Sequence, residues 1–494
     1  MRVVGQDRRV SSTRSPFGDM DPEEFRRHAH RLADWIADYF AQSSKYPVLA
    51  QIAPGTIASA LPGEAPARGE SFESMLSDFE TILLPGITHW NHPGFFAYFA
   101  ITGSAPGVLA EFLSAALNVQ AMLWRTSPAA TELEEVTLRW LRKLLGLPSV
   151  FEGVIYDTAS ISTLHALAAA RERAVPSVRS LGLAGRDTVP RMRVYCSDQT
   201  HSSIDKAGIL LGLGQESLRK IPSDSDFRMR VDALASAIAE DRSDGWLPLA
   251  VVATVGTTSS TSIDPVPQIA EVCRRESIWL HVDAAYAGVA AMVPGHEWIL
   301  DGSADADSLV VNPHKWMFTP FDLSVLYCRH MDVIRAAFAL TPEYLKTLET
   351  GPVRNLMDTG IQLGRRFRAL KLWMVMRHFG ADGLRVRLAE HMRLARLFAS
   401  WVDASAEFER LAPVPFSVVC FRARTAMSDE DSDVLNGRIL EAVNASGEIF
   451  ISHTRLNGRY TLRLAIGNLH TTESHVRRAW DLLQEKLSTV RRAD

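Results

Sequence analysis

The sequence predicts an α/β protein whose central sheet is largely parallel and covered by helices on both faces. From about residue 105 to 370, short apolar runs alternate with stretches of helical periodicity, and this order is typical of parallel sheets. The chain has 494 residues, more than one hydrophobic core usually holds. We therefore expect an N-terminal helical segment (1–104), a large α/β domain (105–370) and a smaller C-terminal α+β domain (371–494).

Two amphipathic helices are expected in the N-terminal segment. The first begins at Asp21, a good N-cap, with Pro22 at the first helical position and Glu24 placed for a capping box. Residues 47–70, rich in Pro, Gly and Ala, predict an extended connector, and the second helix covers about 71–84. In the first helix one apolar face is formed by Phe25, Ala29, Leu32, Ile36 and Tyr39.

The middle of the chain contains six apolar runs that we interpret as strands. Helical stretches over 160–174, 229–240 and 265–276 lie between them. The runs are Val154–Tyr156, Val194–Cys196, Leu249–Thr254, Ile278–Val282, Ser308–Val311 and Leu323–Tyr327.

The last part of the chain begins with a long helix near 365–379. Beyond it, Val418–Phe421 and Tyr460–Ile466 predict two strands between helices. This mixture is the reason for expecting a small α+β domain.

Composition narrows the class of partner. The formal net charge of −4 gives no reason to expect nucleic acid or an anionic membrane. No eighteen apolar residues run together, so we expect no membrane span. Residues 1–17 carry arginines and serines without an apolar run, which favours a disordered tail over a secretory signal or an organelle address.

The four cysteines lie far apart, each in an apolar stretch, and none has Cys/His ligand spacing. We therefore expect no metal site, and buried free thiols in a reducing cytoplasm. They are Cys196, Cys273, Cys328 and Cys420.

Three predicted strands of the middle part run into unusual polar residues. Asp283 follows one strand, Lys315 follows the next along the chain, and His201 lies in the loop after an earlier one. Ligands of open parallel sheets gather at the carboxyl ends of the strands. We therefore expect an acid, an amine and an imidazole at one edge of the sheet.

These residue types match the needs of pyridoxal 5'-phosphate. Its aldehyde requires a lysine amine, here Lys315, and its ring nitrogen requires a carboxylate, here Asp283. His201 can stack on the ring. Singly, each is more often a solvated lysine, a turn aspartate or a structural histidine; their coincidence favours the cofactor. No glycine-rich nucleotide motif follows any predicted strand.

The phosphate of that cofactor needs N–H donors. Ala159 and Ser160 open a predicted helix, and helix N-termini bind anions. Asp157, just before them, would repel phosphate if it faced inward, so we assign it a capping role.

Beyond this reading of the residues, the segment Asn312-Pro313-His314-Lys315-Trp316 resembles the lysine signature of the group II pyridoxal-phosphate decarboxylases, the aromatic-L-amino-acid decarboxylase family. The resemblance runs from about residue 20 to 485. It implies the aspartate aminotransferase-like fold (fold type I) of the pyridoxal-phosphate transferases. It also implies a homodimer whose N-terminal segment embraces the partner subunit. The supporting motifs are HPGFFAYF (92–99), SPAATELE (127–134), HSSIDKAG (201–208), VATVGTT (252–258), WLHVDAAYAG (279–288) and LGRRFRALKLW (363–373).

Carried over by position, the resemblance implies that Lys315 bonds the cofactor and Asp283 pairs with its ring nitrogen. His201 would stack on the ring and help to orient the substrate carboxylate. Tyr344 would return a proton to the substrate carbon after CO2 leaves. It lies in the segment 341–362, which has no periodicity, as expected of a lid that closes over the site. Other cofactor contacts would come from Ala159, Ser160, Asn312, His314, Thr258 and Ala285.

The implied substrate is an aromatic L-amino acid, and the aromatic stretch 89–99 is expected to line its pocket, although ordinary core is an equal alternative. Animal family members usually carry threonine where Ile101 stands, so we expect a weaker preference for catechols than for tryptophan, phenylalanine or tyrosine. Gly364 agrees with the aromatic branch rather than with histidine decarboxylases. The expected substrate contacts are Trp90, Tyr98, Phe99, Ile101, Gln120 and Met122, the last two near the partner subunit.

Two alternatives remain open on the sequence. The same cofactor supports an aromatic aldehyde synthase or an aminotransferase. Related aldehyde synthases tend to carry Phe at the position of Tyr344, which favours decarboxylation. A non-catalytic protein that binds pyridoxal phosphate would have no need of Tyr344.

Overall fold

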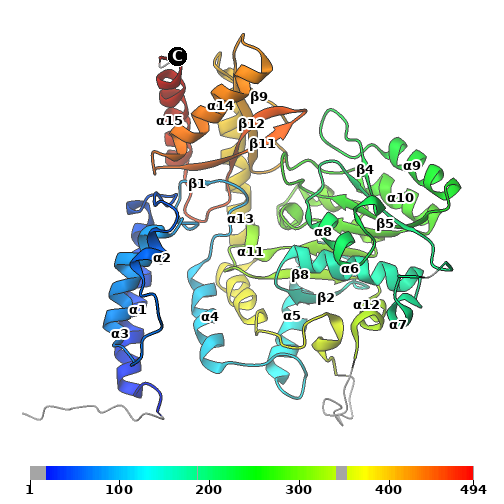
Figure 1. Cartoon of the computed structure of the whole chain (residues 1–494), viewed down its shortest axis with the longest axis horizontal. Helices are drawn as coiled ribbons and strands as arrows, with labels where there is room; N and C mark the ends of the chain where they lie inside the picture. The colour runs from blue at the N-terminus through cyan, green and yellow to red at the C-terminus, as the bar shows by residue number, and fades with distance from the viewer. Residues whose placement is uncertain (1–17, 186, 341–352, 493–494) are drawn as a thin grey trace, which may run out of the picture.

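The computed structural model describes residues 18–185, 187–340 and 353–492 and contains two β-sheets (Figure 1). The large sheet has the strand order β2-β8-β7-β6-β5-β3-β4. Its strands from β7 to β4 are parallel, whereas β8 is antiparallel to both neighbours. The bounds are β2 Glu152–Tyr156, β3 Met192–Ser197, β4 Leu218–Ile221, β5 Leu247–Thr254, β6 Trp279–Asp283, β7 Ser308–Val311 and β8 Ser324–Cys328.

All six strands predicted in the middle of the chain are confirmed, to within two residues at each end. The sequence prediction missed β4, whose residues Leu218-Arg219-Lys220-Ile221 contain no apolar run. As the outermost strand of the sheet, β4 has one neighbour only, and charged side chains are common at such edges.

Alternate residues of the large sheet enter two different cores, which explains its long apolar runs. Val251 and Val282 pack into one core, while Val252 and Trp279 pack into the core on the other face. The second core also holds the apolar residues of α6. Asp283 alternates with Val282, so its side chain faces the same side as α6.

Helices cover both faces of this sheet. The predicted stretches 160–174, 229–240 and 265–276 are confirmed as α6, α9 and α10. The helices of this region are α4 Ala105–Leu117, α5 Pro128–Leu144, α6 Ala159–Ala174, α7 Val178–Leu181, α8 Ser203–Leu210, α9 Val231–Ser243, α10 Val266–Glu276, α11 Pro313–Trp316 and α12 Met331–Phe338.

The small sheet has the order β1-β11-β12-β10-β9. The predicted strands Val418–Phe421 and Tyr460–Ile466 are confirmed as β10 and β12, but β11 was missed. An Asn457-Gly458 turn with both φ values positive joins β11 to β12, and that dipeptide is a strong hairpin signal. The bounds are β1 Phe95–Phe96, β9 Phe408–Arg410, β10 Val418–Ala423, β11 Phe450–Leu456 and β12 Arg459–Ala465.

Three C-terminal helices pack on the small sheet: α13 Ala369–Ala404, α14 Asp429–Asn444 and α15 Glu473–Arg492. The helix expected near 365–379 extends further, because α13 continues beyond a kink at Gly380, whose φ is +64°. The helix boundary that the sequence indicated therefore marks this kink.

At the N-terminus, α1 (Pro22–Gln42) begins as predicted, with the Asp21 carboxylate accepting hydrogen bonds from the N–H groups of Glu23 and Glu24. The predicted connector 47–70 contains a short helix, α2 (Thr56–Ala60), and α3 (Phe72–Asp78) follows, continuing in irregular helical turns to Gly86. These helices stand beside α4 and away from the large sheet (Figure 1).

Two further expectations concern cysteines and membranes. All four cysteines are buried and free, as predicted. In the part of the chain that the structure describes, no helix has the length and apolar character to cross a membrane.

Candidate active site

The carboxyl ends of neighbouring parallel strands bring the predicted acid, amine and imidazole to one edge of the large sheet. Asp283 is the last residue of β6, Lys315 lies on α11 directly after β7, and His201 follows β3. They are close enough to interact electrostatically, since Asp283 raises the pKa of both other groups. The structure thus brings together the three residues that the sequence singled out.

Asp283 is a buried carboxylate held at the end of its strand. Its Oδ1 accepts a hydrogen bond from the N–H of Ala285 at 3.1 Å, and its backbone carbonyl accepts one from Val255 at 2.8 Å. The register pairs it with Thr254 of β5. A carboxylate fixed in this way suits a protonated ring nitrogen.

Lys315 is half-buried, and its Nζ lies 5.2 Å from the centroid of the Phe99 ring. Burial lowers the pKa of the amine, Asp283 opposes this, and the positive charge of Arg463 lowers the pKa further. A lowered pKa favours the neutral amine, which is the nucleophilic form.

His201 lies exposed at the rim of this edge. Its Nδ1 accepts a hydrogen bond from the N–H of Ser203 at 3.1 Å. Partial desolvation is the main cause that lowers its pKa, with Lys315 acting in the same direction and Asp283 opposing. The imidazole is therefore neutral near pH 7, with the proton on Nε2.

The N-terminus of α6 offers free N–H groups for a phosphate. Thr158 is the N-cap, but its side chain makes no capping hydrogen bond, so the first-turn N–H groups of Ala159 and Ser160 are available. The Asp157 carboxylate accepts from the N–H of Thr158 at 2.6 Å. Asp157 thus lies one residue before the N-cap, a small correction to the capping role that we expected for it.

Asn312 and His314 are buried beside Lys315. Burial lowers the pKa of His314 to about 3, so the ring is neutral, and its Nδ1 accepts from the N–H of Leu323 at 2.8 Å. The proton is then on Nε2, which lies 3.3 Å from the Asn312 amide. The amide atom at that distance is Nδ2, and two N–H donors cannot pair, so the amide is assigned the opposite orientation, in which Oδ1 accepts from Nε2 and Nδ2 can donate to an anion. As placed in the structure, the Oδ1 of Asn312 has no hydrogen-bond partner among the described residues.

Two more predicted cofactor contacts lie at the same edge. Thr258 is exposed in the loop after β5, and Ala285 is buried just after β6. Together with the N-terminus of α6 and Asn312, these groups fit pyridoxal phosphate: an amine, a carboxylate and several N–H donors at one sheet edge.

The expected substrate contacts separate into groups. Phe99 stacks on Tyr286 with centroids 3.8 Å apart, and Tyr286 stacks on Trp316, which forms an aromatic wall beside Lys315. Trp90 and Tyr98 instead stack on each other at 5.9 Å, next to the small sheet. Tyr98 is 54% exposed, whereas Phe95 and Phe96 are fully buried, so only part of the aromatic segment 89–99 serves as core.

Ile101 is half-buried two residues after Phe99. Gln120 and Met122 contact other parts of their own chain: the Gln120 Oε1 accepts from the N–H of Arg365 at 2.6 Å, and Met122 packs beside Met357. Tyr344 and most of its loop lie outside the described residues.

The sequence prediction missed Arg463, a buried residue of β12 whose guanidinium lies 4.6 Å from the centroid of the Phe99 ring. A signal was present, because this arginine interrupts the predicted apolar strand Tyr460–Ile466. A charge within an apolar run often marks a functional position.

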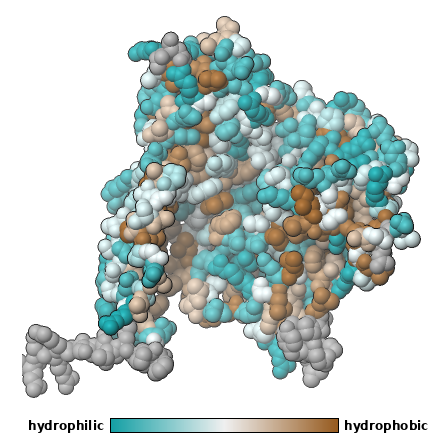
Figure 2. Space-filling model, viewed as in Figure 1, coloured by the Kyte–Doolittle hydropathy of each residue, from teal (hydrophilic) through white to brown (hydrophobic). Residues whose placement is uncertain are grey.

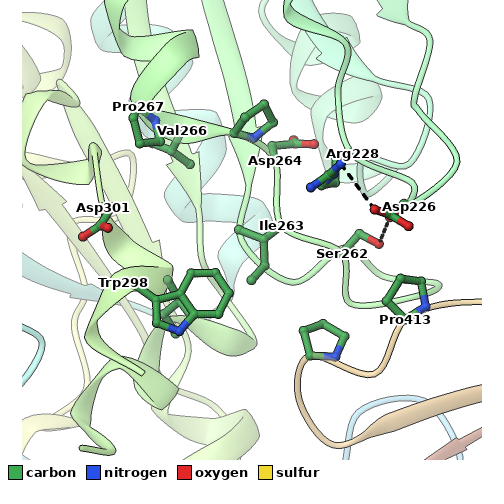
Figure 3. A pocket seen from close by; sticks show the side chains of 13 residues that line it. Asp226, Arg228, Ser262, Ile263, Asp264, Val266, Pro267, Trp298, Asp301 and Pro413 are labelled. Atoms are coloured by element: carbon green, nitrogen blue, oxygen red, sulfur yellow. Dashed lines mark hydrogen bonds and ion pairs between the residues drawn. The ribbon is translucent and has the colours of Figure 1, made fainter. Parts of the chain in front are cut away.

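A cavity of about 360 Å³ lies between the large domain and residues 413–415 (Figure 3). Trp298 and several prolines line it, together with Asp226 and Asp264. It contains none of the predicted site residues. Among the residues that the structure describes, no three His, Cys, Asp or Glu side chains gather as metal ligands would.

Asp264 connects this cavity with the end of β5. Its carboxylate accepts from the backbone N–H groups of Thr254 at 2.8 Å and Met229 at 2.7 Å. Burial raises the pKa of this carboxyl to about 7. Since Thr254 pairs with Asp283, Asp264 braces the strand next to the site.

Comparison with known proteins agrees with this geometry. Residues 54–424 match the family described as the pyridoxal-dependent decarboxylase conserved domain. Tyrosine decarboxylase 3 of Petroselinum crispum is 42% identical over 492 residues, covering 97% of this chain and 94% of its own. Phenylacetaldehyde synthase of Arabidopsis thaliana is 41% identical over 480 residues, covering 95% and 97%.

A similar solved structure is that of Oryza sativa TDC with PLP and tryptamine. Its TM-score is 0.92 at 37% sequence identity, and the match covers 96% of this chain and 99% of that one. The aspartate aminotransferase-like α/β fold expected from the sequence is confirmed at this level.

Proposed function

This chain belongs to the pyridoxal-dependent decarboxylase family, and we propose that it converts an aromatic L-amino acid into the corresponding amine and CO2. The observation that carries the proposal is the meeting of Lys315, Asp283 and His201 at one edge of the large sheet. The two relatives compared above are named as a tyrosine decarboxylase and a phenylacetaldehyde synthase, and both names refer to aromatic compounds.

The cofactor is pyridoxal 5'-phosphate. When bound, it supplies a protonated ring that accepts the electron pair left on the substrate carbon as CO2 departs. We propose that Lys315 attaches it and that Asp283 holds the proton at the ring nitrogen. Its phosphate would be bound by Ala159, Ser160 and Asn312, with His314, Thr258 and Ala285 around it.

Substrate orientation decides which bond breaks. His201, neutral and exposed at the rim, would contact the cofactor ring when it is bound and would help to orient the substrate carboxylate. The aromatic wall that begins at Phe99 excludes water from the reacting carbon. The lowered pKa of Lys315 favours its neutral amine, and this form can change places with the substrate's amino group on the cofactor aldehyde.

Tyr344 is proposed as the acid that protonates the substrate carbon after CO2 leaves. The alternative outcome is an aldehyde, and it is a real competitor because the chain is 41% identical to a phenylacetaldehyde synthase. Tyr344 favours the amine. Aminotransfer is a third outcome on the same cofactor, and a non-catalytic protein is the least favoured.

The test uses the purified holoenzyme with L-tryptophan, L-phenylalanine, L-tyrosine and L-DOPA. We expect amine and CO2 in equal amounts from at least one of them. Aldehyde with ammonia would establish the synthase, and keto acid formed when a 2-oxo acid is supplied as amino acceptor would establish an aminotransferase. A coloured protein without any product would support the non-catalytic alternative.

We also propose a homodimer with the active site at the subunit interface. Support comes from α4, whose Leu109 and Leu117 are 61% and 64% exposed, next to exposed Phe112 and Leu113. Apolar surface borders the hollow between the N-terminal helices and the rest of the molecule (Figure 2). An apolar helix face of this kind is typical of an interface. Gln120 and Met122, which follow α4, would then reach the partner's site.

A charge placed in this interface provides the test. Leu117→Glu should convert the dimer into a monomer and remove activity, because a carboxylate buried in an apolar interface costs several kcal/mol, about 3 or more. Light scattering coupled to gel filtration measures the mass. Leu181→Glu, at a similarly exposed leucine on α7, is the control and should leave the mass unchanged.

A cytoplasmic location is proposed on the four cysteines. All are free and buried, and burial raises the pKa of each thiol. Thiols in this state are typical of a reducing compartment.

A further inference from the structure

The cavity of about 360 Å³ between the large domain and residues 413–415 has mainly apolar walls (Figure 3). Trp298, Ile263 and Val266 line it on the large domain, and Pro413 and Pro415 face them from the chain that leads into β10. Trp298 is 52% exposed, although tryptophan side chains are usually far more buried. A concave site of this volume with an accessible aromatic side chain is typical of small-molecule binding.

The wall on the large domain is fixed by hydrogen bonds to the backbone. The carboxylate of Asp264 accepts from two backbone N–H groups, at 2.8 Å and 2.7 Å. The carbonyl of Ser262 accepts from the N–H groups of Gly256 and Thr257, both at 3.0 Å. A wall held in this way exists before a ligand arrives, so little binding free energy is lost in ordering it.

The charged side chains of the cavity favour a cation. Among the described residues that line it, Asp226, Asp264 and Asp301 are acidic, and Arg228 is basic. The guanidinium of Arg228 lies 2.9 Å from the carboxylate of Asp224 and 3.3 Å from that of Asp226, so its positive charge is already paired. An anion that entered would meet carboxylates and no unpaired arginine or lysine of the lining.

Asp301 is the carboxylate best placed to hold that cation. Its side chain is exposed, and no side chain in the part of the chain that the structure describes pairs with it. Its backbone N–H donates to the carbonyl of Trp298 at 3.0 Å, so the two residues are neighbours on one side of the cavity, opposite Asp226 and Pro413 (Figure 3). An aromatic surface beside an unpaired carboxylate suits a ligand that joins a ring to an ammonium group.

Other small ligands use this lining less completely. An amino acid adds a carboxylate, for which the cavity offers no unpaired cation. A neutral aromatic compound leaves Asp301 without a partner. An aliphatic diamine can pair with Asp301 and Asp226, but it has no ring to place against Trp298 and the prolines.

We propose that this cavity is a second binding site, which takes a primary arylalkylamine with its ring against Trp298 and its ammonium group at Asp301. The site distinguishes the amine from the amino acid that carries one carboxylate more. Arylalkylamines are the product class of the proposed function, and only this link to the enzyme's own product rests on that function. The binding itself depends on the lining alone.

The experiment places a reporter in the cavity. The holoenzyme is labelled with 5-fluorotryptophan, and the fluorine resonance of Trp298 is the one that disappears in Trp298→Phe. Added 2-phenylethylamine should shift this resonance saturably. The neutral 2-phenylethanol should bind about fivefold to tenfold more weakly, and the anion 3-phenylpropionate should leave the resonance unchanged. Amine that reacts at Lys315 is followed separately, by the absorbance of the cofactor.

Two variants test the role of the carboxylate. Asp301→Asn should weaken the binding of 2-phenylethylamine by about threefold to fivefold and leave that of 2-phenylethanol unchanged, because only the amine carries a charge. Glu297→Gln is the matched control, since Glu297 is an exposed carboxylate next to Trp298 in the sequence but does not line the cavity. It should change the Kd of the amine by less than about twofold.

The proposal would be overturned by the absence of a saturable shift at Trp298, or by equal affinities for the amine and the alcohol. Equal weakening of the amine by Asp301→Asn and Glu297→Gln would overturn it as well, and so would tighter binding of 1,4-diaminobutane than of 2-phenylethylamine. The proposed function fails in a different measurement, by the wild type's forming no amine from any aromatic amino acid. That failure leaves the titration unaffected, because the titration uses added amine.

Discussion

The two sheets contribute to the site in different ways. In the large sheet most strands are mainly apolar, and the chemistry begins where strands end, at Asp283, Lys315 and the loop that carries His201. In the small sheet the residue that reaches the site, Arg463, lies within a strand. One sheet presents its carboxyl edge to the site and the other presents a face.

The contrast follows from how each sheet is covered. The large sheet is buried on both faces, so only its edge can meet a ligand. The small sheet packs α13, α14 and α15 on one face and the large domain on the other. A polar residue on the latter face can therefore enter a site between the sheets without leaving its strand.

The largest effect is expected at the edge of the large sheet. Lys315→Ala should remove the cofactor's colour and lower amine formation by about 1000-fold or more, because no other amine can take its place. Absorbance and product analysis measure both. Lys315→Arg keeps a positive charge but offers no nucleophile, and it should be equally inactive; an active arginine variant would show that charge alone is needed.

A change at Ile101, two residues after Phe99, should have a smaller effect, confined to specificity. Ile101→Thr adds a hydroxyl that can meet a ring hydroxyl of the substrate, and an unpaired buried hydroxyl costs about 1–3 kcal/mol. We expect kcat/KM for DOPA relative to phenylalanine to rise about fivefold or more. Ile101→Val, which has similar shape but no hydroxyl, should leave the ratio unchanged. If Ile101→Thr fails to raise the ratio, Ile101 does not face the substrate ring.

The smallest effect on activity is expected behind β5, where a substitution should change stability instead. Asp264 has its pKa raised to about 7 in the folded protein, whereas an unfolded aspartate titrates near 3.9. Its contribution to stability is complete below about pH 4 and is lost as pH rises toward 7, at roughly 1.4 kcal/mol per pH unit. Asp264→Asn, which resembles the protonated acid, should therefore gain stability relative to wild type over that range.

Urea unfolding of the holoenzyme at several pH values between 4.5 and 7.5 measures this difference. Asp301→Asn changes an exposed carboxylate on the same cavity and should show no such trend. A wild-type-minus-variant difference that stays constant with pH would mean that the folded-state pKa of Asp264 is not raised to about 7 as expected.

Much of the architecture was readable in the sequence because it depends on local pattern. Six strands of the large sheet are continuous apolar runs, and α1 carries its own N-cap at Asp21. The elements that were missed lack such a pattern. β4 is short and charged, and β11 was indicated only by the Asn457-Gly458 turn that follows it.

The residues of the site also fall into two groups, those that local pattern predicts and those that it does not. By itself, the sequence determined that Asp283, Lys315 and His201 follow strands of one parallel sheet, since strand ends are a property of local pattern and chain order. Only the tertiary structure decided that Arg463 joins them and that Trp90 and Tyr98 pack with the small sheet. Which face of a strand meets another domain depends on contacts between residues hundreds of positions apart, and no local pattern carries that information.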